Sequence, residues 1–335
     1  MKTQLVYSEE FQKHDNITHP ENAKRLVAMM QEIKKTSFFE KLESIIPNLL
    51  DEEYLYDVHS KNMIDKVKFA SLKENSWLDL DTYVCKGDYN IARLAAGGLV
   101  ELTENVINDK SRNGFALVRP PGHHSTIDRS MGFCLFNNIA IAANMALKNV
   151  KRVLIFDLDV HHGNGTQDIF YKRKDVMYQS FHLSPHYPGT GDTREIGENE
   201  GSGYNVNTPL NYGNGDKAVS QLLDEIFLPI AKQFKPDIIL VSCGYDSHHA
   251  DILGGLNLSA DFFGEIISKF QKIQPKIVCT LEGGYNLDWI GKCLLSQLSQ
   301  LLLNPISIED YTDEKKDIDY VLKRIKNEMN VYWKI

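Results

Sequence analysis

The chain has 335 residues, a formal net charge of −8, five widely spaced cysteines and a hydrophobic content of 42%, which together indicate a folded globular protein. The negative charge argues against direct, nonspecific nucleic-acid binding, and the odd cysteine count without any Cys-x-x-Cys argues against a disulfide framework or a zinc knuckle. No apolar run reaches membrane-spanning length and no signal-peptide core is present, so we expect a cytoplasmic protein without a membrane partner, with export by a signal-independent route left open.

The first third of the chain is predicted to contain one strand and three helices. Residues 5–7 form the candidate strand, and Pro20 stands where a proline favours the start of a helix. Apolar residues at helical spacing return over residues 58–72 and 89–107.

Between the last two of these helices, residues 77–83 are expected to form a surface loop. Its Asp79 and Asp81 either meet a cationic substrate at the rim of a pocket or act as solvated loop acids and helix caps, and we favour the second interpretation. His19 is expected to hold a loop rather than to bind a metal, because no second ligand lies near it in the sequence.

Four later segments are predicted to be strands, and each is followed by reactive side chains. They are residues 114–118 before His123 and His124, residues 153–156 before Asp157, Asp159 and His161, residues 237–242 before Asp246, and residues 276–281 before Tyr285. The first two, with a helix at 139–147 between them, form a predicted βαβ unit. The remaining predicted segments are a strand at 176–182, a long loop at 184–203, a helix at 216–234, a charged loop at 309–317 and an amphipathic tail at 321–325.

The residues after the strand at 153–156 have the spacing of a metal site. Asp157, Asp159 and His161 are two positions apart, so their side chains project from one face of the chain if the extended geometry continues. Two carboxylates that close repel each other unless a cation or a histidinium compensates them. For this stretch alone, the alternative is an acidic strand end whose aspartates cap a helix and whose histidines are exposed.

The four strand ends are expected to converge, because the carboxyl ends of parallel strands line the ligand crevice of an α/β sheet. Asp159, His161 and Asp246 then form a three-ligand set that leaves positions open for water and substrate, as in a catalytic zinc site. The tandem histidines are free for proton transfer, and Tyr285 can donate a hydrogen bond to an oxyanion. Together these residues indicate metal-assisted hydrolysis of an acyl bond.

Six ordered motifs lie at these strand ends and in the loops between them. They are Arg119-Pro-Pro-Gly-His-His, Asp157-Leu-Asp-Val-His-His-Gly-Asn-Gly, Tyr187-Pro-Gly-Thr-Gly, Gly244-Tyr-Asp-Ser-His, Leu253-Gly-Gly-Leu-Asn-Leu and Glu282-Gly-Gly-Tyr-Asn-Leu. Together they resemble the zinc-dependent histone deacetylase family, which includes bacterial histone-deacetylase-like proteins and acetylpolyamine amidohydrolases. The resemblance implies an arginase/deacetylase-like α/β fold, with a single domain over residues 1–335 and a central parallel sheet of about eight strands flanked by helices.

The resemblance implies two kinds of metal site. One Zn²⁺ per chain would be bound by Asp159, His161 and Asp246. A structural K⁺ would be held, mostly through backbone oxygens, by Asp157, Asp159, His161, Ser180 and Phe181, and a second K⁺ would lie around Phe170, Val176 and Tyr204. Iron or cobalt stays open as the native metal, because two carboxylates and one imidazole accept several divalent ions.

The resemblance also implies catalytic roles. His124 would act as general base toward the attacking water and as general acid toward the leaving amine. His123 would be its electrostatic partner with Asp157 oriented against it, and Tyr285 would polarise the acyl carbonyl together with the metal. Asn164 stands where many class I members carry an aspartate, so the chain looks like class II. Because an amide raises imidazole basicity less than a carboxylate does, His124 should stay neutral to a lower pH.

The substrate pocket implied by the resemblance has aromatic walls. Phe133 and Tyr187 would grip the stem of an acyl-lysine and the Gly132 carbonyl would accept its amide hydrogen, with core packing as the alternative for the two rings. Leu253 occupies the place where polyamine-specific relatives tend to carry a glutamate. We therefore predict hydrolysis of acetyl or short-chain acyl groups on lysines of an acetylated protein or peptide. An acetylpolyamine or other small amide is the alternative, a weakly catalytic acyl-lysine-binding module is the third possibility, and acyl-chain preference and oligomeric state are left open.

Overall fold

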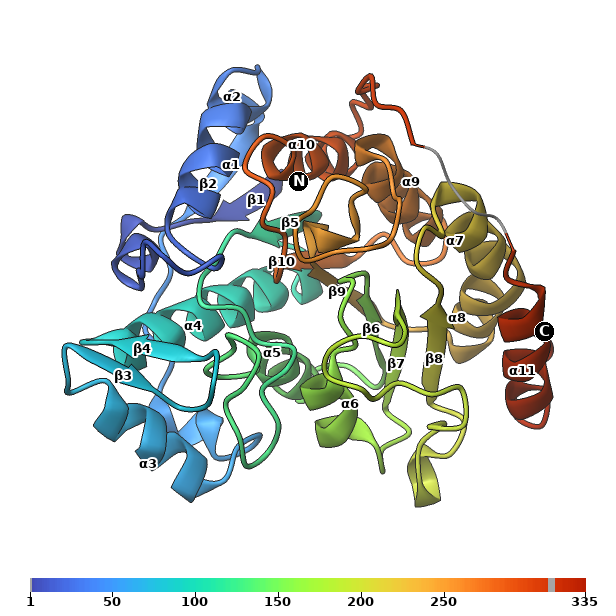
Figure 1. Ribbon diagram of the computed structural model, residues 1–335, viewed down its shortest axis with the longest axis horizontal. Helices are drawn as coiled ribbons and strands as arrows, with labels where there is room; N and C mark the ends of the chain where they lie inside the picture. Colours follow the sequence, from blue (N-terminus) through green and yellow to red (C-terminus); the bar gives the residue numbers. More distant parts are fainter. Residues whose placement is uncertain (1, 313–316) are drawn as a thin grey trace.

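The computed structural model describes residues 2–312 and 317–335 and is organised around an eight-stranded sheet (Figure 1). The strand order is β2-β1-β5-β10-β9-β6-β7-β8, and every neighbouring pair is parallel. The strands are β1 (Thr3–Val6), β2 (Leu42–Ile45), β5 (Asn113–Ala116), β6 (Val153–Asp157), β7 (Val176–Leu183), β8 (Asn205–Leu210), β9 (Ile238–Cys243) and β10 (Ile277–Leu281). The predicted parallel α/β architecture is therefore confirmed, whereas residues 313–316 of the predicted charged loop lie outside the described residues.

Helices cover both faces of this sheet. Figure 1 shows α1, α9, α10 and the α7–α8 pair along one face and α4, α5 and α6 along the other, with α11 beside the edge strand β8. Their bounds are α1 (Lys24–Lys34), α2 (Phe38–Lys41), α3 (Lys61–Ala70), α4 (Asp88–Ile107), α5 (Asn138–Ala146), α6 (Asn164–Phe170), α7 (Asp216–Leu222), α8 (Leu228–Phe234), α9 (Ala260–Gln271), α10 (Ile290–Leu301) and α11 (Asp319–Met329). Because both faces are covered, the central strand β6 is buried along its whole length, which suits an apolar run in a parallel sheet. No helix of the described part of the chain combines the length and the apolarity that crossing a bilayer requires.

The start of α1 differs from the sequence prediction. Pro20 does not open the helix, which begins at Lys24. The Asp15 carboxylate accepts the backbone N–H of Ala23 at 2.8 Å, and the buried side chain of Glu21 is turned toward Arg119. A turn that carries a buried ion pair therefore separates the proline from the helix.

Two further differences concern short strands. Residues 77–83 do not form a simple surface loop, because β3 (Asn75–Trp77) and β4 (Tyr83–Cys85) pair as an antiparallel hairpin. The rings of Trp77 and Tyr83 face each other across it at 6.2 Å, and such cross-strand aromatic pairs stabilise a hairpin. Strands β2 and β8 were not predicted, because few apolar residues mark them and β8 contains two asparagines and a proline.

The sheet order puts β5, β10, β9 and β6 in consecutive positions. The tandem histidines follow β5, Tyr285 follows β10 and Asp246 follows β9. The Asp157–His161 stretch begins at the last residue of β6. Since neighbouring strands are parallel, their carboxyl ends share one edge of the sheet. The predicted convergence of four strand ends therefore follows from the observed topology.

A buried ion-pair cluster lies behind this edge. The Glu21 carboxylate contacts the Arg119 guanidinium at 2.8 Å and that of Arg25 at 3.0 Å, and all three side chains are fully buried. Arg25 also donates to the backbone oxygens of Glu282 at 2.6 Å and Gly284 at 2.7 Å. The cluster thus joins the entry of α1 to the ends of β5 and β10.

We expect Glu21→Gln to lower the free energy of unfolding by about 3–5 kcal/mol, because two buried guanidinium groups lose their counter-charge. Burial alone would raise the pKa of Glu21, but Arg119 and His14 outweigh it and hold the pKa well below its ordinary value of 4.5. This contribution is therefore present in full above pH 4.5 and is lost as the pH falls further below it.

Urea denaturation at pH 7 and at lower pH measures this effect. The matched control is Glu10→Gln, which removes a carboxylate from an exposed pair with Lys13 and should leave the midpoint nearly unchanged. Equal midpoints for the two variants would contradict a stabilising role of the buried cluster.

Candidate active site

Three potential metal ligands meet at the carboxyl ends of β6 and β9. His161 Nδ1 lies 3.0 Å from Asp159 Oδ1 and 3.2 Å from Asp246 Oδ2, and the three residues form one group whose ligand atoms all lie within 4.8 Å of one another. Both carboxylates are fully buried. The sequence-predicted ligand set is therefore brought together in space.

The hydrogen bonds within the described residues leave one carboxylate oxygen of this group without a well-aligned donor. Asp159 accepts the backbone N–H groups of His161 and Gly283, each at 2.9 Å, and Asp246 Oδ1 accepts that of Val160 at 3.0 Å. Asp246 Oδ2 is buried and receives no well-aligned hydrogen bond from the described residues, although His161 Nδ1 lies 3.2 Å away. A buried oxygen in that position is costly unless a cation compensates it, so the residues present fit a bound metal ion.

The pKa shifts of Asp246 and His161 also fit a bound cation. Burial and the neighbouring Asp159 raise the pKa of Asp246 to about 7. Burial alone would lower the pKa of His161, but its close contacts with the carboxylates of Asp159 and Asp246 outweigh burial and raise the pKa to about 10. A metal ion bound here would therefore displace a proton from the imidazole and take over its role as counter-charge.

A second histidine-rich cluster is better explained by hydrogen bonds than by a metal. His248 Nε2 and His249 Nε2 lie 3.0 and 2.8 Å from the two oxygens of Asp310. The backbone N–H of Ala250 donates to His248 Nδ1, so the proton of the neutral ring sits on Nε2 and points at Asp310. Metal ligation through Nε2 would require the opposite tautomer.

The tandem histidines have different partners and opposite pKa shifts. His123 Nδ1 lies 3.1 Å from Asp157 Oδ2; burial alone would lower the pKa of His123, but Asp157 and Asp159 outweigh it and raise the pKa to about 10. His124 Nδ1 lies 2.8 Å from Asn164 Oδ1, and burial together with the charge of His123 holds its pKa well below the ordinary value. Two groups whose environments push their pKa values apart are suited to different proton-transfer roles.

A pocket with a volume of about 230 Å³ leads to these residues. Its lining includes the predicted substrate-binding residues Gly132, Phe133, Tyr187 and Leu253, together with Tyr285, which was predicted to be catalytic. The Phe133 ring lies 5.9 Å from that of Tyr285, and the Tyr187 ring lies 5.1 Å from that of His124. Phe133 and Tyr187 therefore line the pocket rather than the interior core. The pocket surface is mostly apolar, with the polar side chains of His123, His124 and His161 also in its lining.

A model of the histone deacetylase domain matches residues 19–301. The chain belongs to the histone deacetylase family. It is 37% identical to a probable deacetylase of Archaeoglobus fulgidus, an alignment that covers 86% of this chain and 82% of that protein. It is also 37% identical to Histone deacetylase 5 of Arabidopsis thaliana, where the alignment covers 90% of this chain and 49% of the relative. The crystal structure of the HDA15 HD domain is similar with a TM-score of 0.93 and 34% identity, covering 99% of this chain and 97% of the other.

The family resemblance drawn from the six motifs and the deacetylase fold are thereby confirmed, and this chain is a deacetylase of the histone deacetylase family. It spans about half of the Arabidopsis relative but most of the archaeal one.

The acidic residues of the β3–β4 hairpin divide between two roles in this deacetylase. Asp79 Oδ1 accepts the backbone N–H groups of Asp81 and Thr82, as expected of a loop acid. Asp81 lines the pocket, and burial together with Asp79 raises its pKa to about 6. His19 holds this hairpin, since its Nε2 lies 3.1 Å from the Asp81 carbonyl oxygen.

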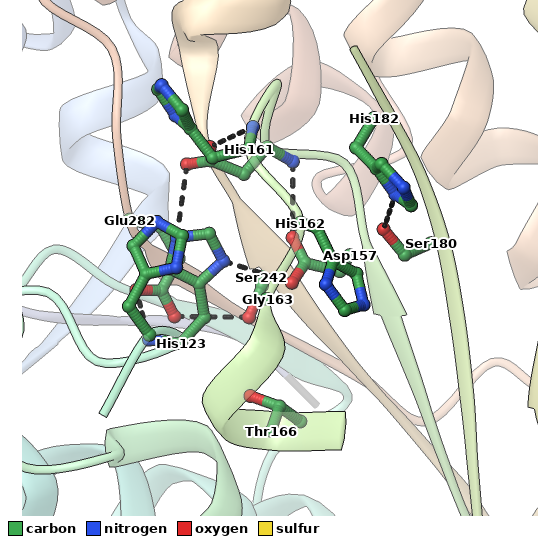
Figure 2. Close-up of polar contacts among 12 residues, drawn as sticks. His123, Asp157, His161, His162, Gly163, Thr166, Ser180, His182, Ser242 and Glu282 are labelled. Atoms are coloured by element: carbon green, nitrogen blue, oxygen red, sulfur yellow. Dashed lines mark hydrogen bonds and ion pairs between the residues drawn. The ribbon is translucent and has the colours of Figure 1, made fainter. Parts of the chain in front are cut away.

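The residues implied for potassium lie on adjacent strands of the deacetylase sheet. Asp157 of β6 and Ser180 of β7 are partners in register, and Phe181 follows directly. The Ser180 hydroxyl lies 3.0 Å from His182 Nδ1, a contact drawn in Figure 2. In the second implied set, the carbonyl oxygens of Phe170 and Tyr204 accept backbone N–H groups, while Val176 begins β7.

Two residues near the reacting centre had no role predicted from the sequence, although Glu282 opens one of the six motifs. Glu282 accepts the N–H groups of Gly122 at 2.7 Å and His123 at 3.1 Å and the Ser242 hydroxyl at 3.1 Å, and Figure 2 shows it between His123 and Ser242. His186 lines the pocket and stacks on His161 at 4.8 Å. The position of Glu282 directly before Gly-Gly-Tyr was a usable signal, whereas His186 lies in a long loop without one.

Proposed function

We propose that this deacetylase is zinc-dependent and removes acetyl or short acyl groups from lysine side chains of proteins. The observation that supports it best is the buried Asp246 Oδ2, which has no well-aligned hydrogen bond from the described residues and is grouped with Asp159 and His161 at the floor of the pocket. A zinc ion held by these three residues would lower the pKa of a water molecule and polarise the acyl carbonyl. Within this proposal K⁺ has a structural role, the described residues form one deacetylase domain, and the enzyme acts in the cytoplasm.

The proton-transfer steps fall to the tandem histidines. The Nδ1–H of His124 donates to Asn164, which leaves Nε2 unprotonated and able to take a proton from the attacking water. The same nitrogen then returns that proton to the leaving amine. His123 stays protonated between Asp157 and Asp159 and offsets the negative charge of the floor.

Tyr285 is the proposed donor to the acyl oxygen. Burial and the charge of Asp246 raise the pKa of its phenol well above the ordinary value, so the hydroxyl keeps its proton. A fixed donor in a water-poor site stabilises charge that develops in the transition state. The walls formed by Phe133 and Tyr187 suit the aliphatic stem of lysine.

A comparison of substrates tests the proposed function. We expect an acetyl-lysine peptide to exceed acetylspermidine in kcat/KM by about tenfold or more, because Leu253 offers no charge to a polyamine ammonium. Acetate release measured for both substrates decides the point. Leu253→Glu is the informative variant, since a carboxylate there should favour acetylspermidine relative to the wild type. A preference of the wild type for acetylspermidine would favour small amides, and no release from either substrate would favour an acyl-lysine-binding module.

A further inference from the structure

One carboxylate connects the two loops that form opposite sides of the pocket floor. Asp251 lies between β9 and α9, and its Oδ2 accepts the backbone N–H of Tyr285 at 2.6 Å and that of Asn286 at 3.0 Å. Its Oδ1 accepts the backbone N–H of Leu253 at 2.9 Å. Tyr285 and Leu253 both line the pocket, whereas Asp251 does not.

The loop that carries Tyr285 needs such an anchor. Gly283 and Gly284 directly precede Tyr285, and Gly284 has a φ of +108°. Because glycine can adopt many backbone conformations, these two residues do little by themselves to hold the loop in one conformation. The Asn286 side chain returns a hydrogen bond to the Ala250 carbonyl at 2.7 Å, so the two loops hold each other from both sides. Hydrogen bonds to an ionised carboxylate are shorter and stronger than neutral ones.

The opposite side of the same loop is held by a cation. Arg25 donates to the Gly284 carbonyl at 2.7 Å, and its guanidinium carbon lies 5.0 Å from the centre of the Tyr285 ring. The backbone before the tyrosine is thus fixed through a carbonyl, and the backbone at the tyrosine is fixed through its N–H. These two contacts hold one peptide unit from both ends, and the Asn286 N–H bond to Asp251 holds the next, so the backbone is restrained on both sides of the Tyr285 Cα.

We propose that Asp251 is a positioning residue that aims the Tyr285 hydroxyl at the acyl oxygen. This inference rests on the proposed role of Tyr285. Asp251 accepts hydrogen bonds from the backbone of Leu253, Tyr285 and Asn286 rather than from the proposed metal ligands, and it lies outside the pocket lining. A donor displaced by about 1 Å loses much of its effect on the transition state, so loss of the anchor lowers kcat more than it changes KM.

A double-mutant cycle tests this inference. Asp251→Asn keeps the size of the side chain but places an NH₂ group against a backbone N–H. We expect kcat on an acetyl-lysine peptide to fall about 10- to 100-fold in the Tyr285 enzyme. In the Tyr285→Phe enzyme the same change should cost less than about threefold, because the hydroxyl to be aimed is absent. Metal content should be the same in all four proteins.

The matched control is Asp261→Asn, since Asp261 also accepts a backbone N–H, that of Ile308 at 2.7 Å, but lies outside the pocket lining. Its kcat should stay within about twofold of the wild type. If Asp251→Asn does not fold, the cycle is run with Asp251→Glu, which keeps the charge on a longer stem and should give the same non-additivity. An equal loss in both backgrounds would overturn the positioning role, whereas unchanged turnover of Tyr285→Phe alone would overturn the proposed function instead.

Discussion

Asp246→Ala is expected to remove the bound metal and to lower turnover by at least about a thousandfold. The substitution deletes one of three proposed ligands and with it the buried Oδ2, which has no well-aligned hydrogen bond from the described residues. The remaining Asp159 and His161 then resemble an ordinary ion pair, 3.0 Å apart. Metal content measured by elemental analysis and acetate release from an acetyl-lysine peptide test both parts of the expectation.

The matched control is a substitution of Asp237, which lies at the opposite end of β9 from Asp246. Asp237 immediately precedes β9 and accepts the backbone N–H groups of Lys151 and Arg152, whereas Asp246 follows the strand. Asp237→Ala should therefore keep metal and turnover. Chelation of the wild type should abolish activity and added Zn²⁺ should restore it; full turnover of a metal-free protein would refute the metal mechanism.

Tyr285→Phe should keep its metal and lose turnover by about a hundredfold or more, the size expected for one oxyanion donor. The ring remains to pack against Phe133, and only the hydroxyl is lost. Because the donor acts mainly in the transition state, kcat should fall while KM changes little. Steady-state kinetics together with metal analysis measure the effect.

Tyr187→Phe provides the comparison at the pocket wall. It removes the same atom from a ring that is 37% exposed and whose proposed contact with substrate is apolar, so turnover should change little. Equal losses in the two variants would mean that removing a phenol disturbs the pocket in general. That result would take Tyr285 out of the proposed chemistry.

Runs of apolar residues in the sequence predicted most strands of the central sheet. The apolar runs that became β6, β9 and β10 lie within one or two residues of their predicted bounds, because strands buried on both faces must be almost uniformly apolar. The apolar pattern did not predict β2 and β8, because these strands carry polar residues and are held by tertiary contacts. It also misplaced the start of α1, because Pro20 lies before a turn around the buried Glu21 rather than at the start of the helix.

The sequence by itself determined which residues follow the strands and hence which ligand and proton-transfer groups were available. Their spacing could not decide which neighbour each one meets, because strand order depends on long-range pairing. In the structure Asp157 lies against His123 and Asp246 lies beside His161, the neighbours that the family resemblance had implied. Only the tertiary structure revealed anchors such as Glu282 and Asp251, whose hydrogen bonds join segments far apart in the chain and therefore leave no local pattern.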